Sequence, residues 1–257
     1  MSRRNSAPRH DVDVSEMDGV RYLHFGSDWV QGAMRVARPW SLELEYTREM
    51  MAGLLLRPAP QWPKKALLIG LGAGSLAKFL YRNRPECRIT AVEINPQVAL
   101  VAHQYFKVPD DPKRLNVLLG CGADYILGGD STFDTILVDG FGADGKPGQL
   151  DTTPFYLACR ARLTEHGLFA MNLLRERGFK QQLDRIIEAF SGQVLVLPPG
   201  IAGNTIVLAG SGAMQEVTQE ELAERAKALK QATRLDLQPT LRRMEEAGLF
   251  VNGSLRL

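Results

Sequence analysis

The stretch ALLIGLGAGS, residues 66–75, decides the fold of this chain. Its first four residues are apolar, which is typical of a short strand buried on both faces. Glycines follow at positions 70, 72 and 74, and a helical pattern over residues 75–82 begins directly after them. Glycines between a strand and a helix allow a tight turn and let a nucleotide approach the backbone where the helix starts. A packing turn is the plainer alternative. The stretch therefore favours a nucleotide-binding α/β domain.

Strands and helices alternate on the carboxyl side of this stretch. Apolar runs predict further strands, and residues with helical spacing lie between them. The expected strands are 88–92, 115–119, 135–138 and 168–172, and the expected helices are 75–82, 96–105 and 155–163. This alternation predicts a parallel sheet covered by helices on both faces. Residues 193–197 and 205–209 are expected to close the sheet as a pair, and two charged helices, 216–233 and 239–247, are expected to cover it facing solvent.

The amino-terminal quarter has a different pattern. Residues 1–17 are expected to be a disordered lead, and residues 18–60 a small β-rich unit. Alternating residues predict strands near 20–25 and 29–34, and apolar residues at helical spacing follow within 42–56. The segment RPAPQWP, residues 57–63, cannot continue either element because it holds three prolines. The main domain is expected to span residues 61–257.

Composition excludes several classes of protein. The 257 residues include 31 Lys and Arg against 29 Asp and Glu, a net charge of +2 that gives no basic footprint for nucleic acid. No apolar run approaches the ~20 residues that a membrane-spanning helix needs, and residues 1–13 lack the apolar core of a signal peptide. The three cysteines and four histidines are scattered, so we expect reduced thiols, no metal site and a cytoplasmic location.

Glu93 ends the next predicted strand, about 20 residues after the glycine loop, where a carboxylate can accept both hydroxyls of a ribose. A capping role before Pro96 is the alternative. The pairing of loop and acid does not by itself separate NAD from S-adenosylmethionine. However, Ala77 or Lys78 stands where the dinucleotide pattern has its third glycine. A site for methionine and ribose, as in class I methyltransferases, is therefore the better fit.

Asp139 follows the predicted strand 135–138. Ligands of open α/β sheets bind at the carboxyl ends of the strands. A carboxylate at that edge can hold a cationic amine and act as its base, although capping of the following turn is the structural alternative. Asp139 is therefore the candidate catalytic residue.

Over residues 19–211 the chain resembles the spermidine synthase family, the polyamine aminopropyltransferases. Four motifs carry the resemblance. They are the glycine loop 70–74, the sequence VEIN at 92–95 in place of the family's Val-Glu-Ile-Asp, DGFGA at 139–143 in place of its Asp-Ser-Ser-Asp-Pro, and LDTTPFY at 150–156. The resemblance implies a Rossmann-like class I methyltransferase-type parallel sheet with a small N-terminal β-rich unit, which agrees with the α/β fold expected from the strand and helix pattern.

The resemblance also implies the roles of individual residues. Asp139 is the implied catalytic group. The implied donor-binding residues are Gly70, Gly72, Ala73, Gly74, Glu93, Cys121 and Gly122. The implied substrate-binding residues are Gln31, Tyr46, Gly142 and Asp144. Decarboxylated S-adenosylmethionine or S-adenosylmethionine is the implied co-substrate, with no tightly bound cofactor. A small-molecule amine acceptor and a homodimer formed through the edges of the N-terminal strands are the implied partners.

Three acids of the family pattern are absent from this chain. The acid of the glycine loop, which holds the donor's amine, is Ala73, and the acid near the adenine is Cys121. The second acid of the amine-binding loop is Gly142, with Asp144 two residues further on. A fourth acid, the Glu that follows the family's Tyr, is replaced by Arg48 after Tyr46, unless Glu49 takes its place. Each carboxylate–ammonium contact contributes about 1.5–3 kcal/mol, so the absent acids predict weaker binding of polyamines.

We expect transfer of an aminopropyl group from decarboxylated S-adenosylmethionine to an amine, as in polyamine biosynthesis. A methyltransferase acting on an unidentified small substrate is the first alternative. A catalytically silent homologue that binds a nucleoside thioether is the second. The absent acids favour the alternatives, whereas Asp139 and Glu93 favour catalysis.

Overall fold

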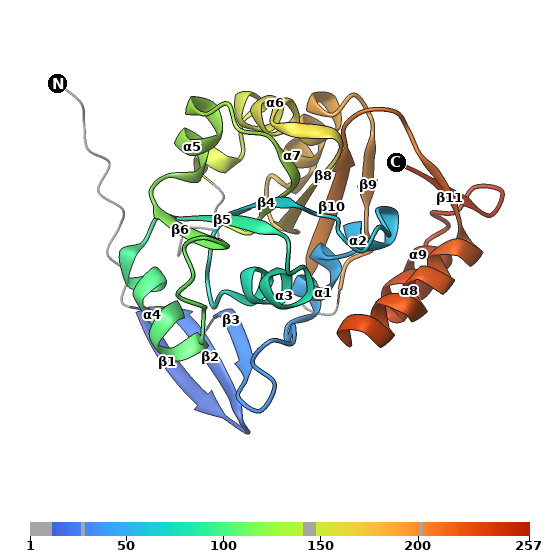
Figure 1. Cartoon of the computed structure of the whole chain (residues 1–257). Coiled ribbons are helices and arrows are strands. Elements are labelled where there is room, and N and C mark those ends of the chain that lie inside the picture. Colours follow the sequence, from blue (N-terminus) through green and yellow to red (C-terminus); the bar gives the residue numbers. More distant parts are fainter. Residues whose placement is uncertain (1–11, 27–28, 141–147, 201–202) are drawn as a thin grey trace.

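A seven-stranded sheet forms the centre of the computed structural model, which describes residues 12–26, 29–140, 148–200 and 203–257 (Figure 1). The strand order is β6-β5-β4-β7-β8-β10-β9. The first five strands run parallel, and β10 runs antiparallel to both of its neighbours. The bounds are β4 (Lys65–Ile69), β5 (Arg88–Glu93), β6 (Leu115–Leu119), β7 (Phe133–Val138), β8 (Leu163–Leu174), β9 (Val194–Val196) and β10 (Asn204–Gly210). The predicted α/β fold is confirmed.

The chain reverses its direction of progress across the sheet beside β4. From β4 it runs outward to β5 and β6, and it then returns to β7 on the other side of β4. The last residues of the two central strands, Ile69 and Val138, lie opposite each other in the parallel register. Such a switch point leaves a crevice at the carboxyl ends of the strands, where ligands of open α/β sheets bind.

The strands of the sheet supply apolar side chains to both faces. On β4, Ala66 and Leu68 belong to one buried cluster, whereas Leu67 and Ile69 belong to another. The second cluster is completed by α5 (Gly122–Gly128), α6 (Thr153–Ala161) and α7 (Phe179–Ala189), which lie above the sheet in Figure 1. The first is completed by α1 (Glu45–Met50), α2 (Gly53–Leu56), α3 (Ser75–Asn83) and α4 (Pro96–Phe106) on the other face.

Local signals fix where several helices start. The Asn95 side chain accepts a hydrogen bond from the backbone of Gln97, and proline occupies the first position of α4. Thr152 caps α6 in the same way. Thr218 and Glu221 form a reciprocal capping box at the start of α8 (Gln219–Thr233). Such caps satisfy backbone N–H groups that have no partner within the helix.

The N-terminal unit begins earlier than the sequence predicts. Residues 12–17, expected to belong to a disordered lead, form β1 (Val12–Met17), which pairs antiparallel with β2 (Val20–Phe25). The turn between them is Asp18-Gly19, with positive φ at both residues, as a tight hairpin requires. β3 (Val30–Arg35) completes this sheet. β1 is held by its pairing with β2 and by its contact with α4. The prediction that residues 12–17 belong to a disordered lead is therefore wrong.

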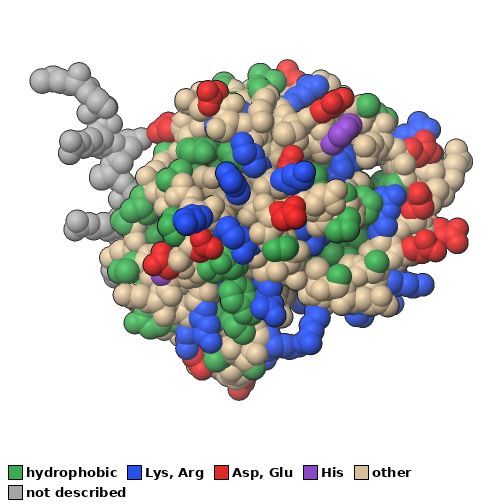
Figure 2. All heavy atoms as spheres, in the orientation of Figure 1, with side chains coloured by type: hydrophobic (Ala, Val, Ile, Leu, Met, Phe, Trp, Pro, Cys, Tyr) green, Lys and Arg blue, Asp and Glu red, His purple; other side chains and the backbone are tan. Residues whose placement is uncertain are grey.

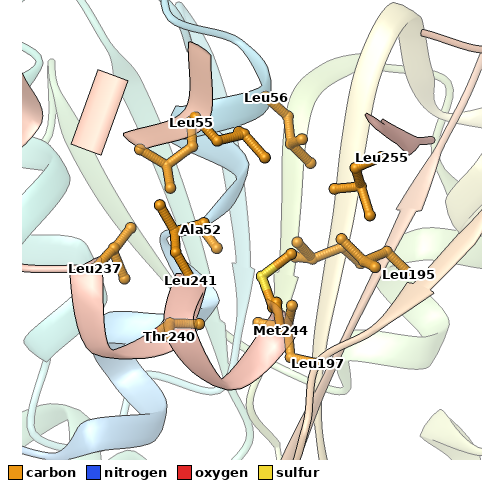
Figure 3. Close-up of a pocket in the computed structure, with 12 residues that line it drawn as sticks. Ala52, Leu55, Leu56, Leu195, Leu197, Leu237, Thr240, Leu241, Met244 and Leu255 are labelled. Carbon is orange, nitrogen blue, oxygen red and sulfur yellow. The ribbon is translucent and has the colours of Figure 1, made fainter. Parts of the chain in front are cut away.

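Helices α1 and α2 fell within the predicted β-rich unit 18–60, but they pack on the central sheet. Met50 and Leu54 belong to the same buried cluster as Leu208 of β10. Helix α8 lies beside α2, and α9 (Gln238–Glu246) packs against α8. A short ribbon of β11 (Glu216–Thr218) and β12 (Ser254–Arg256) contacts α8 as well. Figure 3 shows the apolar pocket between these elements, with Leu55 and Met244 among its lining residues. Helices α8 and α9 therefore each bury one face in this apolar region, whereas the sequence predicted that they only cover the sheet and face solvent.

Charged side chains of both signs are interspersed over the face of the molecule in Figure 2. This mixture differs from the continuous basic stripe that proteins present to nucleic acids. Within the described ranges, no helix has the length and apolar character that crossing a membrane requires.

Candidate active site

The glycine loop and Asp139 meet at the switch point of the sheet. The backbone N–H of Gly70 donates to the carbonyl of Val92, and the backbone N–H of Asp139 donates to the carbonyl of Ile69, each at 2.9 Å. Gly70 has φ of +91°, and a Cβ there would lie 2.4 Å from the backbone oxygen of Asp139. Only glycine allows this backbone conformation and this close approach. The loop and Asp139 are thus fixed side by side.

The carboxylate of Glu93, at the end of β5, turns back toward the glycine loop. Its Oε2 accepts from the backbone N–H of Leu71 and its Oε1 from that of Asn95, both at 2.9 Å. Burial raises the pKa of Glu93, and backbone donors from Asn95, Leu71 and Gly72 oppose that rise. A carboxylate has about four acceptor sites, and the hydrogen bonds from Leu71 and Asn95 occupy one on each oxygen. The arrangement fits a ligand that presents two hydroxyls at the edge of the loop.

Asp139 accepts one hydrogen bond on each oxygen of its side chain. The hydroxyl of Tyr46 on α1 donates to Oδ2 at 3.1 Å, and Nδ2 of Asn172 on β8 donates to Oδ1 at 3.0 Å. Burial raises the pKa of Asp139, and the two donors oppose the rise. The pKa of Tyr46 is also raised, by burial first and by the charge of Asp139 second. The raised pKa of Tyr46 favours the neutral phenol, which can donate to Asp139, and a base at this position must act as the carboxylate.

Two asparagines that the sequence analysis missed extend this network. Asn172 lies on β8 with 3% of its surface exposed, and its Oδ1 accepts from Nδ2 of Asn204 at 2.9 Å. Asn204 is the first residue of β10. In the sequence, Asn172 is a polar residue within an apolar strand, and Asn204 is a polar residue at the start of one. Neither feature by itself indicates a contact with Asp139.

The N-terminal sheet closes over the glycine loop. Gly32 of β3 faces Ala73, and a Cβ at Gly32 would lie 2.6 Å from that of Ala73. The neighbouring backbone carbonyl of Gln31 lies 3.6 Å from a Cβ built on Gly72. Ala73 is 3% exposed and packs in an apolar cluster that includes Leu23. The structure thus brings the predicted residue Gln31 to the loop, and it buries the position where the family pattern has an acid.

Cys121 and Gly122 lie where β6 leads into α5. The thiol of Cys121 is half-buried and donates to Oε1 of Gln149 at 3.5 Å. Gly122 is buried against Ile69, the last residue of β4. These two predicted residues therefore border the same edge of the sheet as the glycine loop. Gly142 and Asp144, the other predicted substrate residues, lie outside the described residues.

Glu49, the acid that could replace the missing carboxylate beside Tyr46, points elsewhere. It is 1% exposed and forms an ion pair with Arg243 of α9, which also donates to Glu45 at 2.9 Å. The hydroxyl of Thr240 donates to Glu49 at 3.4 Å. This cluster ties α9 to the helix that carries Tyr46. No group of three or more His, Cys, Asp and Glu in the described part of the chain is arranged to hold a metal ion.

Polyamine aminopropyltransferases are the first group of known proteins that are similar to this chain. No family model matches the chain. A polyamine aminopropyltransferase of Neisseria meningitidis is 36% identical over 227 residues, which are 88% of this chain and 86% of that protein. A polyamine aminopropyltransferase of Chromobacterium violaceum is 32% identical over 95% of this chain and 93% of that protein.

Methyltransferases are a second group of similar proteins. The human eEF1A lysine and N-terminal methyltransferase is 30% identical over 74% of this chain, which spans 30% of that protein. The crystal structure of human methyltransferase-like protein 13 in complex with SAH superposes with a TM-score of 0.64 at 28% identity, covering 74% of this chain and 93% of that one. A probable spermidine synthase from Corynebacterium glutamicum superposes with a TM-score of 0.73 at 20% identity, covering 88% of this chain and 85% of that one, and supports the fold alone.

Proposed function

Because this chain belongs to the polyamine aminopropyltransferase family, we propose that it transfers an aminopropyl group from decarboxylated S-adenosylmethionine to a small-molecule amine. The observation that carries the proposal is the position of Asp139. Asp139 lies at the switch point of the sheet, where its backbone approaches Gly70. Its carboxylate accepts hydrogen bonds from Tyr46 and Asn172.

In the proposed reaction the nitrogen of the acceptor attacks the propyl carbon that is bonded to the positive sulfur of the donor. The new C–N bond forms as the C–S bond breaks, and the electron pair of that bond goes to sulfur, so methylthioadenosine leaves as a neutral thioether. The proton lost from the attacking nitrogen goes to Asp139. The raised pKa of this carboxyl makes it a stronger base than an exposed Asp. The remaining lone pairs of its oxygens are available to the amine.

The acceptor is expected to be short or to carry a single positive charge. Glu49, the acid three residues after Tyr46, is paired with Arg243, and Ala73 is apolar. A long polyamine gains affinity from several carboxylates along its path, each contributing about 1.5–3 kcal/mol. Among the described residues around Tyr46 and the glycine loop, Asp139 is the acid that faces the proposed amine site, so the second and third ammonium groups of such a chain gain little there.

A panel of ligands tests the proposal. Thermal unfolding is measured with decarboxylated S-adenosylmethionine, S-adenosylmethionine, methylthioadenosine, putrescine and spermidine, and transfer to amines is followed by mass spectrometry. We expect stabilisation by the decarboxylated donor and by methylthioadenosine, together with an aminopropylated product. Stabilisation by the nucleosides with no product from any amine would favour the catalytically silent homologue.

A methyltransferase is the second candidate function. Two observations favour it: the similarity to human methyltransferase-like protein 13 at 28% identity, and an apolar residue, Ala73, in the glycine loop. Without an acid at this position, the carboxylate of ordinary S-adenosylmethionine meets no repulsion from the loop. If the protein is a methyltransferase, S-adenosylmethionine should raise its unfolding temperature, and mass spectrometry should detect a methylated acceptor.

Substituting Glu93 with Ala is expected to weaken binding of methylthioadenosine. Hydrogen bonds to a charged acceptor contribute about 1.5–3 kcal/mol, which corresponds to a dissociation constant larger by roughly 10- to 150-fold. Isothermal titration calorimetry measures the effect. Since Glu93 also accepts from Leu71 and Asn95, the variant is compared with Glu93→Gln, which keeps one acceptor oxygen, and thermal unfolding of both is recorded. Equal affinity in wild type and Glu93→Ala would remove the ribose role.

Substituting Ala73 with Asp is expected to shift preference toward the decarboxylated donor. A carboxylate in the loop attracts the donor's ammonium and repels the carboxylate of S-adenosylmethionine. The ratio of the two affinities should change by about tenfold or more. The site is buried among apolar groups, so a lower unfolding temperature is also expected. Ala73→Asn provides the uncharged control, and an unchanged ratio would place the loop away from the donor's amine.

A further inference from the structure

The two asparagines behind Asp139 lie on adjacent antiparallel strands. Asn172 of β8 pairs with Ile206 of β10, and Asn204 pairs with Leu174, so the two side chains stand on neighbouring strands at the carboxyl end of β8. The backbone carbonyl of Asn204 accepts from the N–H of Gly200 at 3.0 Å, which fixes the start of β10. The hydrogen bonds run from Asn204 to Asn172 and from Asn172 to Asp139.

The amide of Asn172 is held at both ends, by the carboxylate of Asp139 and by the amide of Asn204. An amide has a donor end and an acceptor end. Because Nδ2 of Asn204 donates to Oδ1 of Asn172, the carbonyl end of Asn172 faces Asn204 and its NH₂ end faces Asp139. If the Asn172 amide turned over, its carbonyl oxygen would face the carboxylate of Asp139, and two acceptors would repel each other. The orientation that suits a deprotonated Asp139 is therefore held from one residue further away.

We propose that Asn204 is a positioning residue that acts through Asn172 to hold Asp139 as an oriented carboxylate, ready to accept the proton of the attacking amine. The inference rests on the proposed function for its link to turnover, and on the hydrogen bonds alone for its link to the ionisation of Asp139. Tyr46 performs the matching task on the opposite oxygen, from α1. Two donors on two different elements thus leave the outer lone pairs of Asp139 for the substrate.

The described groups that contact Asp139 keep their charge while Asp139 titrates, so its titration can be measured without interference from them. In the described part of the chain, the titratable side chain hydrogen-bonded to Asp139 is Tyr46, whose raised pKa keeps it neutral through the working range. β8 and β10 contribute the neutral amides of Asn172 and Asn204, and the glycine loop contributes the backbone of Gly70. Loss of the Asn172 donor should therefore raise the pKa of Asp139 further, because the charged form loses a hydrogen bond.

The test combines single and double variants of the full chain. Asn204→Ala, Asn172→Leu and the double variant are compared with wild type in two measurements. One is the titration of the Asp139 carboxyl carbon by NMR, assigned with Asp139→Asn. The other is the pH dependence of kcat/KM for the amine. Thr205→Val serves as the matched control, since Thr205 is the next residue on β10 and its buried hydroxyl has no hydrogen-bond partner among the described residues.

Asn204→Ala should raise the pKa of Asp139 by about one unit and lower kcat/KM by about 10- to 100-fold at neutral pH, with donor affinity unchanged. When Asn172 is already Leu, Asn204→Ala should change neither the pKa of Asp139 nor kcat/KM any further, because the hydrogen bonds through Asn172 are already lost. An unchanged titration in Asn204→Ala, or an equal effect of Asn204→Ala with and without Asn172, would overturn the inference. If wild type transfers no aminopropyl group, the proposed function fails while the NMR titration still decides the role of Asn204.

Discussion

Replacing Asp139 with Asn is expected to abolish aminopropyl transfer while leaving donor binding nearly intact. A positioned general base typically contributes about 10²- to 10⁴-fold to the rate, and Asn cannot accept a proton at neutral pH. The shape is kept: the amide oxygen can accept from Asn172, and the amide nitrogen can donate to the hydroxyl of Tyr46, which is an acceptor as well as a donor. The loss should therefore come from the missing base and not from a rearranged site.

The measurement is kcat for wild type and Asp139→Asn with the amine that the ligand panel selects, together with calorimetric affinity for methylthioadenosine. Tyr46→Phe is the graded comparison, because it removes one of the two donors to Asp139 and leaves the carboxylate in place. It should lower the rate less than Asp139→Asn. Full activity of Asp139→Asn would show that the proton leaves by another route.

The pH dependence of wild type follows from the same carboxyl. Burial raises the pKa of Asp139 above that of an ordinary Asp, so the protonated, inactive form persists to a higher pH than it would at an exposed site. The activity should therefore fall on the acidic side of the profile, and the midpoint of that fall should lie above the ordinary pKa of Asp. Asn204→Ala should move it further upward, which connects the profile to the hydrogen-bond chain behind Asp139.

The fold could be predicted because its signals are local. The strands at 66–69 and 115–119 are apolar runs bounded by Gly, Pro or charged residues, and the structure places β4 and β6 there. Glu93 and Asp139 could be singled out because each directly follows or ends such a run, and the parallel sheet brings those ends to one edge. Helix α5 was missed because its 7 residues begin and end with glycine and carry little periodicity. Helix α7 was missed although its 11 residues are amphipathic.

The rest of the site depends on contacts between residues far apart in the sequence. Tyr46 meets Asp139 across 93 positions, and Arg243 meets Glu49 across 194. Asn172 and Asn204 face each other only because β10 returns antiparallel to β8. No local pattern encodes such a pairing. The charged C-terminal helix α9 therefore looked like a plain solvent-facing cover, although one of its arginines holds the helix that carries Tyr46.

Replacing Arg243 with Met is expected to lower the free energy of unfolding substantially, although Arg243 lies on α9, away from Asp139 and the glycine loop. Arg243 contacts two carboxylates of α1, and one of them, Glu49, is 1% exposed. Removing one partner of a buried ion pair leaves an uncompensated charge and typically costs about 3–5 kcal/mol. Helix α1 should then loosen where it contacts α9, and the hydroxyl of Tyr46 should contact Asp139 less often.

Chemical denaturation and thermal unfolding measure the change. Arg242→Met is the matched control, because Arg242 is the neighbouring residue on α9, is exposed, and loses the same charge; surface changes of this kind usually stay within about 0.5 kcal/mol. The double variant Arg243→Met with Glu49→Gln should recover part of the loss, since no charge is then left buried. If Arg243→Met and Arg242→Met unfold alike, the cluster of Arg243, Glu45 and Glu49 does not hold α1 in place, and the position of Tyr46 must depend on the apolar contacts of Met50 and Leu54 with the central sheet.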